Sequence, residues 1–421
     1  MLDIKFIREN PDIIKEAARK KKVSVDIDSL LKADERRREI GQDLDVKRAR
    51  QNEVSAKMPT APQNEREMLI REMQPIKEAI QKLEEEMKNV MAEWQSLMVK
   101  VPNVPDISVP EGESDKENLE LKQWGKRPSF AFEPKSHVEL MQNLDLVDFD
   151  RGSKVAGFRG YFLKNDAVLL QFALWNFVQD HFSKKGFSQM VVPSLVRREV
   201  FMGTGYIPQG EEDLYKTQDS DYLSGTAEVA TMGYHMDEVL DKKDLPKKII
   251  SFSPCFRREA GAHGKDTKGL IRVHEFYKLE QVVLCEASHE ESVKFHEEIQ
   301  RNTEELTEAL GLHYRVVVNC AGDLGLGQVK KYDIEVWMPS ENTYRETGSA
   351  SYFHDFQTRR LNIRYRDTDG KLKFVHSLNN TALSGRPLIA IIENYQQPDG
   401  SILIPEVLRP YMGGRERLGG R

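Results

Sequence analysis

The chain has 421 residues, of which 31% are charged and 39% hydrophobic, and its net charge is −6. This length predicts two or three domains with a large core. No apolar run reaches the roughly 18 residues of a membrane span and the first residues lack a signal-peptide pattern, so we expect a cytoplasmic protein without membrane contact. The net negative charge argues against a protein surface that is basic throughout. Any contact with nucleic acid must therefore use local basic surfaces.

Three cysteines, Cys255, Cys285 and Cys320, lie far apart and form no C-x-x-C pair. A disulfide framework and a zinc site are therefore not expected. We expect three buried thiols instead.

Two long helices are predicted near the N-terminus. Apolar residues recur at alternating spacings of four and three over residues 69–97, which is the pattern of a coiled-coil seam. The same rhythm is weaker over residues 30–58, where Arg37, Lys47 and Gln51 occupy seam positions. The short break at residues 58–62 contains two prolines and makes the helices antiparallel neighbours. The sequence thus predicts an antiparallel helical arm at about residues 29–98, a device that often serves as a spacer or for dimerisation.

Beyond the arm, the chain reads as a linker followed by a mixed domain. Pro102, Pro105 and Pro110 stop the helix. From Phe130 onward, helical and strand-like segments alternate without a regular βαβ period or a G-x-G-x-x-G loop, which disfavours a Rossmann fold. We expect an α+β fold with a mainly antiparallel sheet flanked by helices, and a flexible tail at residues 413–421.

Residues 169–192 predict an amphipathic helix, then Gly186, then a strand that ends at Pro193. Further along, Thr226 and Glu228, on either side of Ala227, offer oxygen acceptors that suit an ammonium and a hydroxyl group. The alternative is that Thr226 caps the start of a helix.

A long hairpin is predicted for residues 249–283, because residues 249–254 and 273–283 are strand-like and residues 261–269 hold three glycines and two lysines. Its charged and aromatic side chains are those of Arg257, Arg258, Glu259, Arg272, Phe276, Lys278 and Glu280. Such charges are costly to bury unless they are partnered or bind a ligand. Arginine can hold phosphate or carboxylate, an aromatic ring can stack on a base, and glutamate can accept from an amine. The alternative is a surface hairpin with a ladder of salt bridges.

Two polar segments follow. Residues 344–351, Y-R-E-T-G-S-A-S, predict a polar strand that contributes to a binding site, and the alternative is a polar edge strand. Residues 379–386 lead as a strand into an apolar helix that begins near Pro387. His289 and His296 lack metal-binding spacing, and we expect both at the surface.

The hairpin residues F-R-x-E (256–259) and R-V-H-x-F-x-K-x-E-Q (272–281) resemble the second signature motif of class II aminoacyl-tRNA synthetases, and specifically of seryl-tRNA synthetases. The helix, strand and Pro193 resemble the first motif of that class, T-A-E resembles the family's T-x-E loop, and residues 379–381 and 385–396 resemble the third motif. The similarity runs across essentially the whole chain.

The resemblance implies an enzyme that activates L-serine with ATP and transfers the seryl group to tRNA(Ser), and also to tRNA(Sec). It implies a homodimer, Mg²⁺ as the cofactor and no zinc. It also implies a tRNA-binding helical arm at residues 1–101, a linker leading into the catalytic domain at 102–124, and a class II catalytic domain at 125–412. Arm residues implied to contact RNA phosphates are Arg36, Arg37, Arg38, Lys47, Arg48 and Arg50. Acidic residues lie among them, so the alternative for each one is a solvated helix face.

Site roles also follow from the resemblance. The implied catalytic residues are Arg257, Glu346 and Arg386, and the serine-binding residues are Thr226, Ala227, Glu228, Arg257, Glu280 and Thr381. The implied ATP-binding residues are Arg257, Arg258, Glu259, Arg272, Val273, Phe276, Glu346, Thr347, Gly348, Ser349 and Arg386. Glu346 and Ser349 are the implied Mg²⁺ ligands, because that ion takes hard oxygen donors.

Arg258 stands where relatives often carry serine and has no defined role. Gly348, Ala350 and Tyr352 depart from the family's commoner residues, and the gap from Asn379 to Arg386 is one residue shorter than usual. His263, Lys265 and Lys268 lie in the loop that the resemblance implies to meet the tRNA acceptor end, and the alternative is a solvated loop.

Two alternatives stay open. One is an enzyme that loads an activated amino acid on a carrier protein, and the predicted arm argues against it. The other is a non-enzymatic relative that only binds RNA or a partner, and the charged residues of the three motifs argue against that.

Overall fold

The computed structural model describes residues 1–261, 264 and 266–419. The chain divides into two compact units, residues Leu2–Pro102 and a larger unit that holds Met1 and residues Asn103–Arg421. No helix among these described residues is long and apolar enough to cross a membrane.

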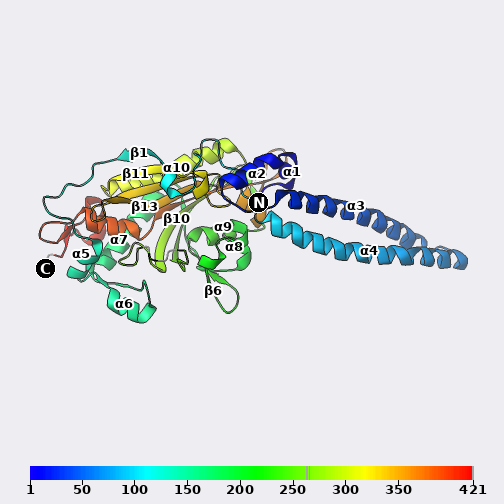
Figure 1. The fold of residues 1–421 in the computed structure, drawn as a ribbon, viewed down its shortest axis with the longest axis horizontal. Helices are drawn as coiled ribbons and strands as arrows, with labels where there is room; N and C mark the ends of the chain where they lie inside the picture. Colours follow the sequence, from blue (N-terminus) through cyan, green and yellow to red (C-terminus); the bar gives the residue numbers. More distant parts are fainter. Residues whose placement is uncertain (262–263, 265, 420–421) are drawn as a thin grey trace. The chain divides into compact units, whose positions relative to one another are not determined.

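The smaller unit is all helical. Its helices are α1 (Ile4–Glu9), α2 (Pro11–Lys20), α3 (Ile27–Lys57) and α4 (Gln63–Met98). Helices α3 and α4 run side by side as an antiparallel pair (Figure 1), which confirms the predicted arm. The Asp26 side chain accepts from the Ser29 backbone N–H and caps α3, and Pro62 immediately precedes α4.

The arm is held by two apolar clusters along its seam. Ile40 and Leu44 of α3 pack with Ile80 of α4. Nearer the helix–helix turn, Val54, Ala61, Leu69 and Met73 form the second cluster. These are positions of the predicted heptad pattern except for Ala61, which lies in the turn between the helices. The hydrophobic effect on this narrow stripe therefore pairs the helices.

Two features of the arm break the simple pattern. Pro75 lies inside α4, where it lacks the backbone N–H that would donate to the carbonyl four residues back. Asp34 of α3 is fully buried, and Arg8, Arg37 and Arg38 place guanidinium nitrogens 3.5, 2.8 and 3.6 Å from its carboxylate. These arginines compensate a charge that would otherwise be costly to bury.

The larger unit is built on an eight-stranded sheet in the order β1-β11-β12-β13-β16-β10-β9-β4. The strands in that order are Leu119–Trp124, Tyr314–Val318, Lys330–Met338, Thr343–Tyr352, His376–Leu383, Glu275–Cys285, Lys247–Phe256 and Ser188–Val191. Neighbouring strands pair antiparallel throughout, except that β4 pairs parallel with β9. The predicted α+β fold with a mainly antiparallel sheet is confirmed.

Three helices cover this sheet. Helix α10 (His289–Ala309) packs on β10, β12, β13 and β16, and α12 (Arg386–Asn394) packs on β12 and β13. Helix α7 (Asp166–Ser183) contacts β4 and β16, and the order of α7 followed by β4 confirms the helix and strand predicted within residues 169–192. The large apolar core lies between these helices and the sheet.

Short elements surround the sheet. The helices are α5 (His137–Asn143), α6 (Phe149–Ala156), α8 (Arg198–Thr204), α9 (Ala227–Gly233) and α11 (Phe356–Leu361). The strands are β2 (Val147–Asp148), β3 (Phe162–Leu163), β5 (Leu195–Val196), β6 (Tyr215–Lys216), β7 (Tyr222–Leu223), β8 (Val239–Asp241), β14 (Arg364–Arg366), β15 (Leu372–Phe374), β17 (Ile402–Leu403) and β18 (Arg417–Leu418). A second apolar cluster joins α8, α9 and α11 to β10, and so brings these helices next to the hairpin.

The structure corrects two expectations and confirms a third. Strand β1 lies at the end of residues 102–124, the stretch predicted as a linker and entry segment. The predicted flexible tail instead pairs β18 with β17 and buries Leu418 completely. His296 is buried rather than exposed, because its ring stacks on Tyr332 at 4.6 Å between centroids. All three cysteines are buried, as predicted.

Candidate active site

The site is built on the predicted hairpin, which is formed by β9 and β10. The two strands pair antiparallel from Phe256↔Glu275 to Lys247↔Leu284. Because side chains alternate along a strand, Phe276, Lys278 and Glu280 project from the same face of β10. Strand β16 lies on the other side of β10 and places Thr381 directly opposite Glu280.

Two adjoining cavities open on this face. The hairpin cavity is lined by Tyr161, Leu163, Gln171, Arg257, Glu259, Leu270, Ile271, Arg272, Val273, Phe276, Lys278, Glu346, Thr347, Thr381, Ser384, Gly385, Arg386 and Leu388. The acidic cavity is lined by residues that include Tyr206, Glu228, Glu280, Ser349, Ser351 and Asn379. Both cavities share Arg257, Lys278, Glu346 and Thr381, so these four residues stand where the cavities meet.

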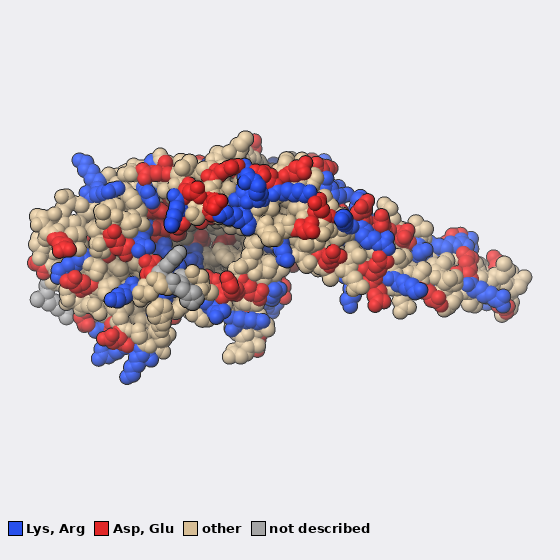
Figure 2. Space-filling view, in the orientation of Figure 1, with Lys and Arg blue, Asp and Glu red and all other residues tan. Residues whose placement is uncertain are grey.

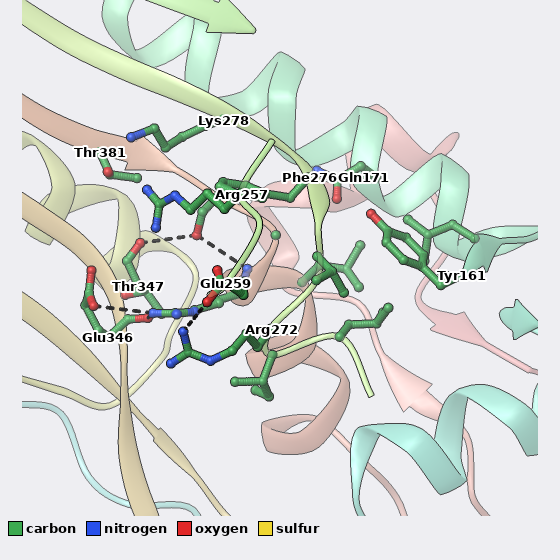
Figure 3. A pocket seen from close by; sticks show the side chains of 18 residues that line it. Tyr161, Gln171, Arg257, Glu259, Arg272, Phe276, Lys278, Glu346, Thr347 and Thr381 are labelled. Atoms are coloured by element: carbon green, nitrogen blue, oxygen red, sulfur yellow. Dashed lines mark hydrogen bonds and ion pairs between the residues drawn. The ribbon is translucent and has the colours of Figure 1, made fainter. Parts of the chain in front are cut away.

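The hairpin cavity is lined by guanidinium groups, carboxylates and the aromatic ring of Phe276 (Figure 3). The Cζ atom of Arg257 lies 5.3 Å from the centroid of the Phe276 ring. The Arg272 guanidinium is 2.5 Å from the Glu259 carboxylate and 3.5 Å from that of Asp266. Glu259 adopts a φ of 54°, a conformation that is uncommon outside glycine and is found at functional sites. This lining suits a flat aromatic ring joined to an anionic group.

In the acidic cavity, Glu280 is paired with a cation, whereas Glu228 forms no ion pair with any residue that the structure describes. Lys278 and Glu280 are both buried, with Nζ 2.5 Å from Oε2, and the Thr381 hydroxyl donates to the same Glu280 oxygen at 3.3 Å. Glu228 is 4% exposed, and its burial raises the pKa of its carboxyl above the ordinary value. A buried carboxylate of this kind is suited to accept from a ligand cation.

Glu346 and Ser349 reach the same cavity because of an irregularity in β13. Side chains three residues apart on a regular strand point to opposite faces. The register between β12 and β13 shifts from Ile334↔Gly348 to Glu335↔Glu346, so one extra residue, Thr347, lies between them. This bulge turns Glu346 and Ser349 toward the acidic cavity, which both residues line.

The charge of Glu346 is favoured by its surroundings. Partial desolvation of the carboxylate opposes ionisation, but the positive charges of Arg386, Lys331 and Arg257 outweigh it and lower the pKa of Glu346. The Arg386 guanidinium lies 3.5 Å from the Glu346 carboxylate and 2.5 Å from its carbonyl oxygen. An ionised carboxylate beside a hydroxyl, both facing the cavity, is a donor set that fits Mg²⁺.

Most of the predicted site residues lie in these cavities, and four do not line either one. Thr226 is buried and caps α9 by accepting from the Glu228 backbone N–H, which was the stated alternative, and Ala227 is buried beside it. Arg258 donates to the carbonyl of Glu212 at 3.1 Å. Gly348 supports the site through its size, because a Cβ there would lie 3.0 Å from the Thr381 carbonyl oxygen.

Of the loop cations, His263 and Lys265 lie outside the described residues. Lys268 is described, but it lines neither cavity.

Three residues in or behind the acidic cavity, namely Lys278, Tyr206 and Gln357, were not among the predicted site residues. Lys278 was part of the hairpin motif, and its alternation with Phe276 and Glu280 could have placed it in the site. Tyr206 and Gln357 both donate to Glu228, at 2.9 and 2.6 Å. These two contacts link segments far apart in the chain, and no local sequence pattern signals them.

Comparisons with known proteins agree along the entire chain. A family model for the seryl-tRNA synthetase N-terminal domain matches residues 1–105, and a model for the tRNA synthetase class II core domain (G, H, P, S and T) matches residues 213–395. The serine–tRNA ligase of Deinococcus radiodurans is 44% identical over 421 residues, covering 100% of this chain and 99% of the relative. That of Dictyoglomus turgidum is 45% identical and covers 98% of both chains.

Solved structures give the same result. The seryl-tRNA synthetase of Pyrococcus horikoshii, in a crystal structure with ATP, superposes with a TM-score of 0.91 at 38% identity over 100% of both chains. The cytoplasmic serine–tRNA ligase of Naegleria fowleri, in complex with AMP, gives a TM-score of 0.88 at 32% identity over 100% of this chain and 99% of that one. The chain therefore belongs to the seryl-tRNA synthetase family, whose members are class II serine–tRNA ligases.

Proposed function

We propose that this chain activates L-serine with ATP to give seryl-adenylate and pyrophosphate, and then transfers the seryl group to the 3′ end of tRNA(Ser) and also of tRNA(Sec). The observation that carries this proposal is the meeting of two unlike cavities at Arg257, Lys278, Glu346 and Thr381. One cavity suits a nucleotide and the other a small polar cation. A reaction that joins two substrates needs such a shared boundary.

ATP occupies the hairpin cavity in this proposal. Phe276 stacks on the adenine ring, and Glu259 accepts from the adenine edge. The Cζ atom of Arg257 lies 5.3 Å from the centroid of the Phe276 ring. Arg272 and Arg386 hold the outer phosphates as bidentate donors. In the free chain Arg272 pairs with Glu259 at 2.5 Å, so nucleotide binding exchanges this ion pair for contacts to the ligand.

Serine occupies the acidic cavity. Glu228 accepts from the α-ammonium, while Glu280 and Thr381, joined by a 3.3 Å hydrogen bond, form polar contacts with the side-chain hydroxyl. Lys278 partly neutralises Glu280, which leaves Glu228 to bind the ligand's positive charge. A larger apolar amino acid would leave these buried polar groups unpaired, and this disfavours its binding.

Glu346 and Ser349 would hold Mg²⁺, as their shared orientation after the Thr347 bulge supports. The bound ion would neutralise charge on the ATP phosphates.

The first step needs no nucleophile from the protein, because the serine carboxylate is already ionised. Its oxygen attacks the α-phosphorus, and pyrophosphate leaves. Arg257 lines both cavities and so can contact the carboxylate and the α-phosphate together, where negative charge is crowded and then redistributed. In the second step the terminal ribose hydroxyl of tRNA attacks the seryl carbonyl, and AMP leaves.

The arm, residues 1–101, binds tRNA in this proposal, and residues 125–412 form the catalytic domain. Arg36, Arg48 and Arg50 form ion pairs with glutamates of α4. Lys47 forms none within the part of the chain that the structure describes. Figure 2 shows basic and acidic side chains interspersed along the visible face of the arm. RNA phosphates would therefore displace local glutamates rather than enter a purely basic groove.

The active form is a cytoplasmic homodimer in this proposal. Exposed apolar side chains on α7 and β4 support it: Leu169 is 47%, Phe172 54% and Val191 81% exposed. Edge strand β4 and its neighbouring helix would bury this patch against a second copy.

Amino-acid-dependent exchange of labelled pyrophosphate into ATP tests the activation step. We expect exchange with L-serine, and little with L-alanine or L-threonine. A purified protein that supports no exchange with serine would sink the proposal. Exchange without any charging of a tRNA that has a long variable arm would instead favour the loading of a carrier protein.

A further inference from the structure

Glu228 is a buried carboxylate at the wall of the acidic cavity. It lies in the first turn of α9, and its residue is 4% exposed although it lines the cavity. No cation forms an ion pair with it among the residues that the structure describes, whereas Glu280 in the same cavity has Lys278 at 2.5 Å. A buried carboxylate without a cation is stable only if hydrogen bonds or a ligand compensate its charge.

Two side chains from other elements provide those hydrogen bonds. Gln357 of α11 donates from Nε2 to Oε1 of Glu228 at 2.6 Å. Tyr206, in the loop after α8, donates its hydroxyl to Oε2 at 2.9 Å. Each carboxylate oxygen thus receives one donor, which fixes the plane of the carboxylate and leaves other lone pairs for a ligand.

The orientation of the Gln357 amide is itself fixed. Ser377 of β16 donates to the amide oxygen at 2.7 Å, and the amide nitrogen also donates to the carbonyl of Thr204 at 3.2 Å. A flipped amide would place its oxygen against two acceptors, Glu228 and the Thr204 carbonyl, and would lose the Ser377 bond. The observed orientation is therefore strongly preferred.

We propose that Gln357 and Tyr206 are positioning residues: they hold Glu228 as an oriented anion against the α-ammonium group that the proposed function already assigns to it. Ser377 acts behind them by orienting Gln357. The inference rests on the proposed function, because it takes the acidic cavity as the serine site. It adds that recognition of the ammonium depends on a hydrogen-bonded set that joins α8, α9, α11 and β16.

Burial and charge around Glu228 are consistent with this role. Burial raises the pKa of its carboxyl, the bonds from Gln357 and Tyr206 oppose that rise, and the nearby charge of Glu280 adds to it. Removal of either donor should therefore weaken the anionic form and free the carboxylate to rotate.

The test compares Gln357→Met and Tyr206→Phe with the unchanged chain in serine-dependent pyrophosphate exchange. Both substitutions keep most of the buried volume and remove one donor each. We expect the KM for serine to rise about 10- to 100-fold, because each lost bond is to a charged group, while the KM for ATP changes little. Gln300→Met is the matched control, since Gln300 is a buried glutamine on α10 that bonds Glu304 and lines neither cavity.

A second measurement separates orientation of Glu228 from general loosening of the pocket. 3-Hydroxypropanoate is serine without its amino group, and its inhibition constant reports the rest of the cavity. We expect Gln357→Met to weaken serine binding while the inhibition constant for 3-hydroxypropanoate stays within about twofold. Equal weakening of both compounds, or an unchanged KM for serine in both variants, would overturn the inference. If the unchanged chain supports no exchange with serine, then the proposed function itself fails.

Discussion

At the scale of single residues, the proposed activation step depends most on Arg257. It lines both cavities, and its Cζ lies 5.3 Å from the Phe276 ring. Arg257→Ala should lower the rate of serine-dependent exchange by at least about 10³-fold, because it removes charge stabilisation in the transition state. Binding of tRNA, measured by filter retention, should change little. Retained exchange would refute the assigned role.

Glu346 gives a second prediction, about the metal. Glu346→Gln keeps the shape of the side chain but removes the charge proposed to bind Mg²⁺. We expect the Mg²⁺ concentration for half-maximal exchange to rise at least about tenfold. Glu341→Gln is the control, since Glu341 pairs with Arg345 and lines neither cavity. An identical Mg²⁺ dependence in both variants would argue against Glu346 as a ligand.

His296 illustrates a residue whose burial affects stability with pH. Its Nε2 lies 3.0 Å from the Ala350 carbonyl oxygen, and burial lowers its pKa from 6.5 to about 4. The unfolded chain therefore binds a proton near pH 6.5 while the folded chain does not, so stability falls as the pH drops from about 6.5 toward 4. Between pH 7 and pH 5, His296→Gln should lose about 2 kcal/mol less of its free energy of unfolding than the unchanged chain. Urea titrations at the two pH values measure this, and equal losses would contradict it.

At the scale of secondary-structure elements, periodicity predicted more than local composition did. The heptad pattern predicted α3 and α4. The alternation of Phe276, Lys278 and Glu280 agrees with the face of β10 that lines the cavities. The bulge at Thr347 had no signal, because it depends on pairing with β12. The two-residue strand β18 is too short to show a period, and so residues 413–421 looked like a free tail. Contacts such as that of Gln357 with Glu228 depend on tertiary structure, which a local pattern does not encode.

In the arm, apolar packing along the seam should stabilise the pair of helices more than surface ion pairs do. Leu44 is buried in the seam, whereas the ion pair of Arg48 with Glu84, 2.7 Å apart, lies at the surface. Leu44→Ala should destabilise the arm by about 2–4 kcal/mol through the cavity it leaves. Glu84→Gln should cost about 1 kcal/mol or less, since solvent screens exposed pairs. Hydrogen exchange of α3 amides reports both changes, and a larger effect for Glu84→Gln would reverse this ranking.

At the scale of the whole molecule, the proposed activation and the proposed tRNA binding fall to different compact units. The larger unit contains both cavities and the residues proposed for activation. The smaller unit consists of helices whose arginines are exposed along α3 and paired with glutamates of α4. Activation of serine should thus depend on the larger unit alone, and tRNA charging should depend on both. The heptad pattern and the three motifs occupy separate stretches of the chain, so the sequence predicted a helical arm apart from the site residues.

Charging of tRNA with labelled serine measures the proposed activation and the proposed transfer together. The measurement compares the full chain with a variant in which residues 50–75, the outer part of the arm, are replaced by a short glycine linker. The account predicts that the full chain charges a tRNA with a long variable arm, and that the shortened chain retains pyrophosphate exchange but loses most charging. If the full chain activates serine and leaves this tRNA uncharged, or if the shortened chain charges it equally well, the account is contradicted.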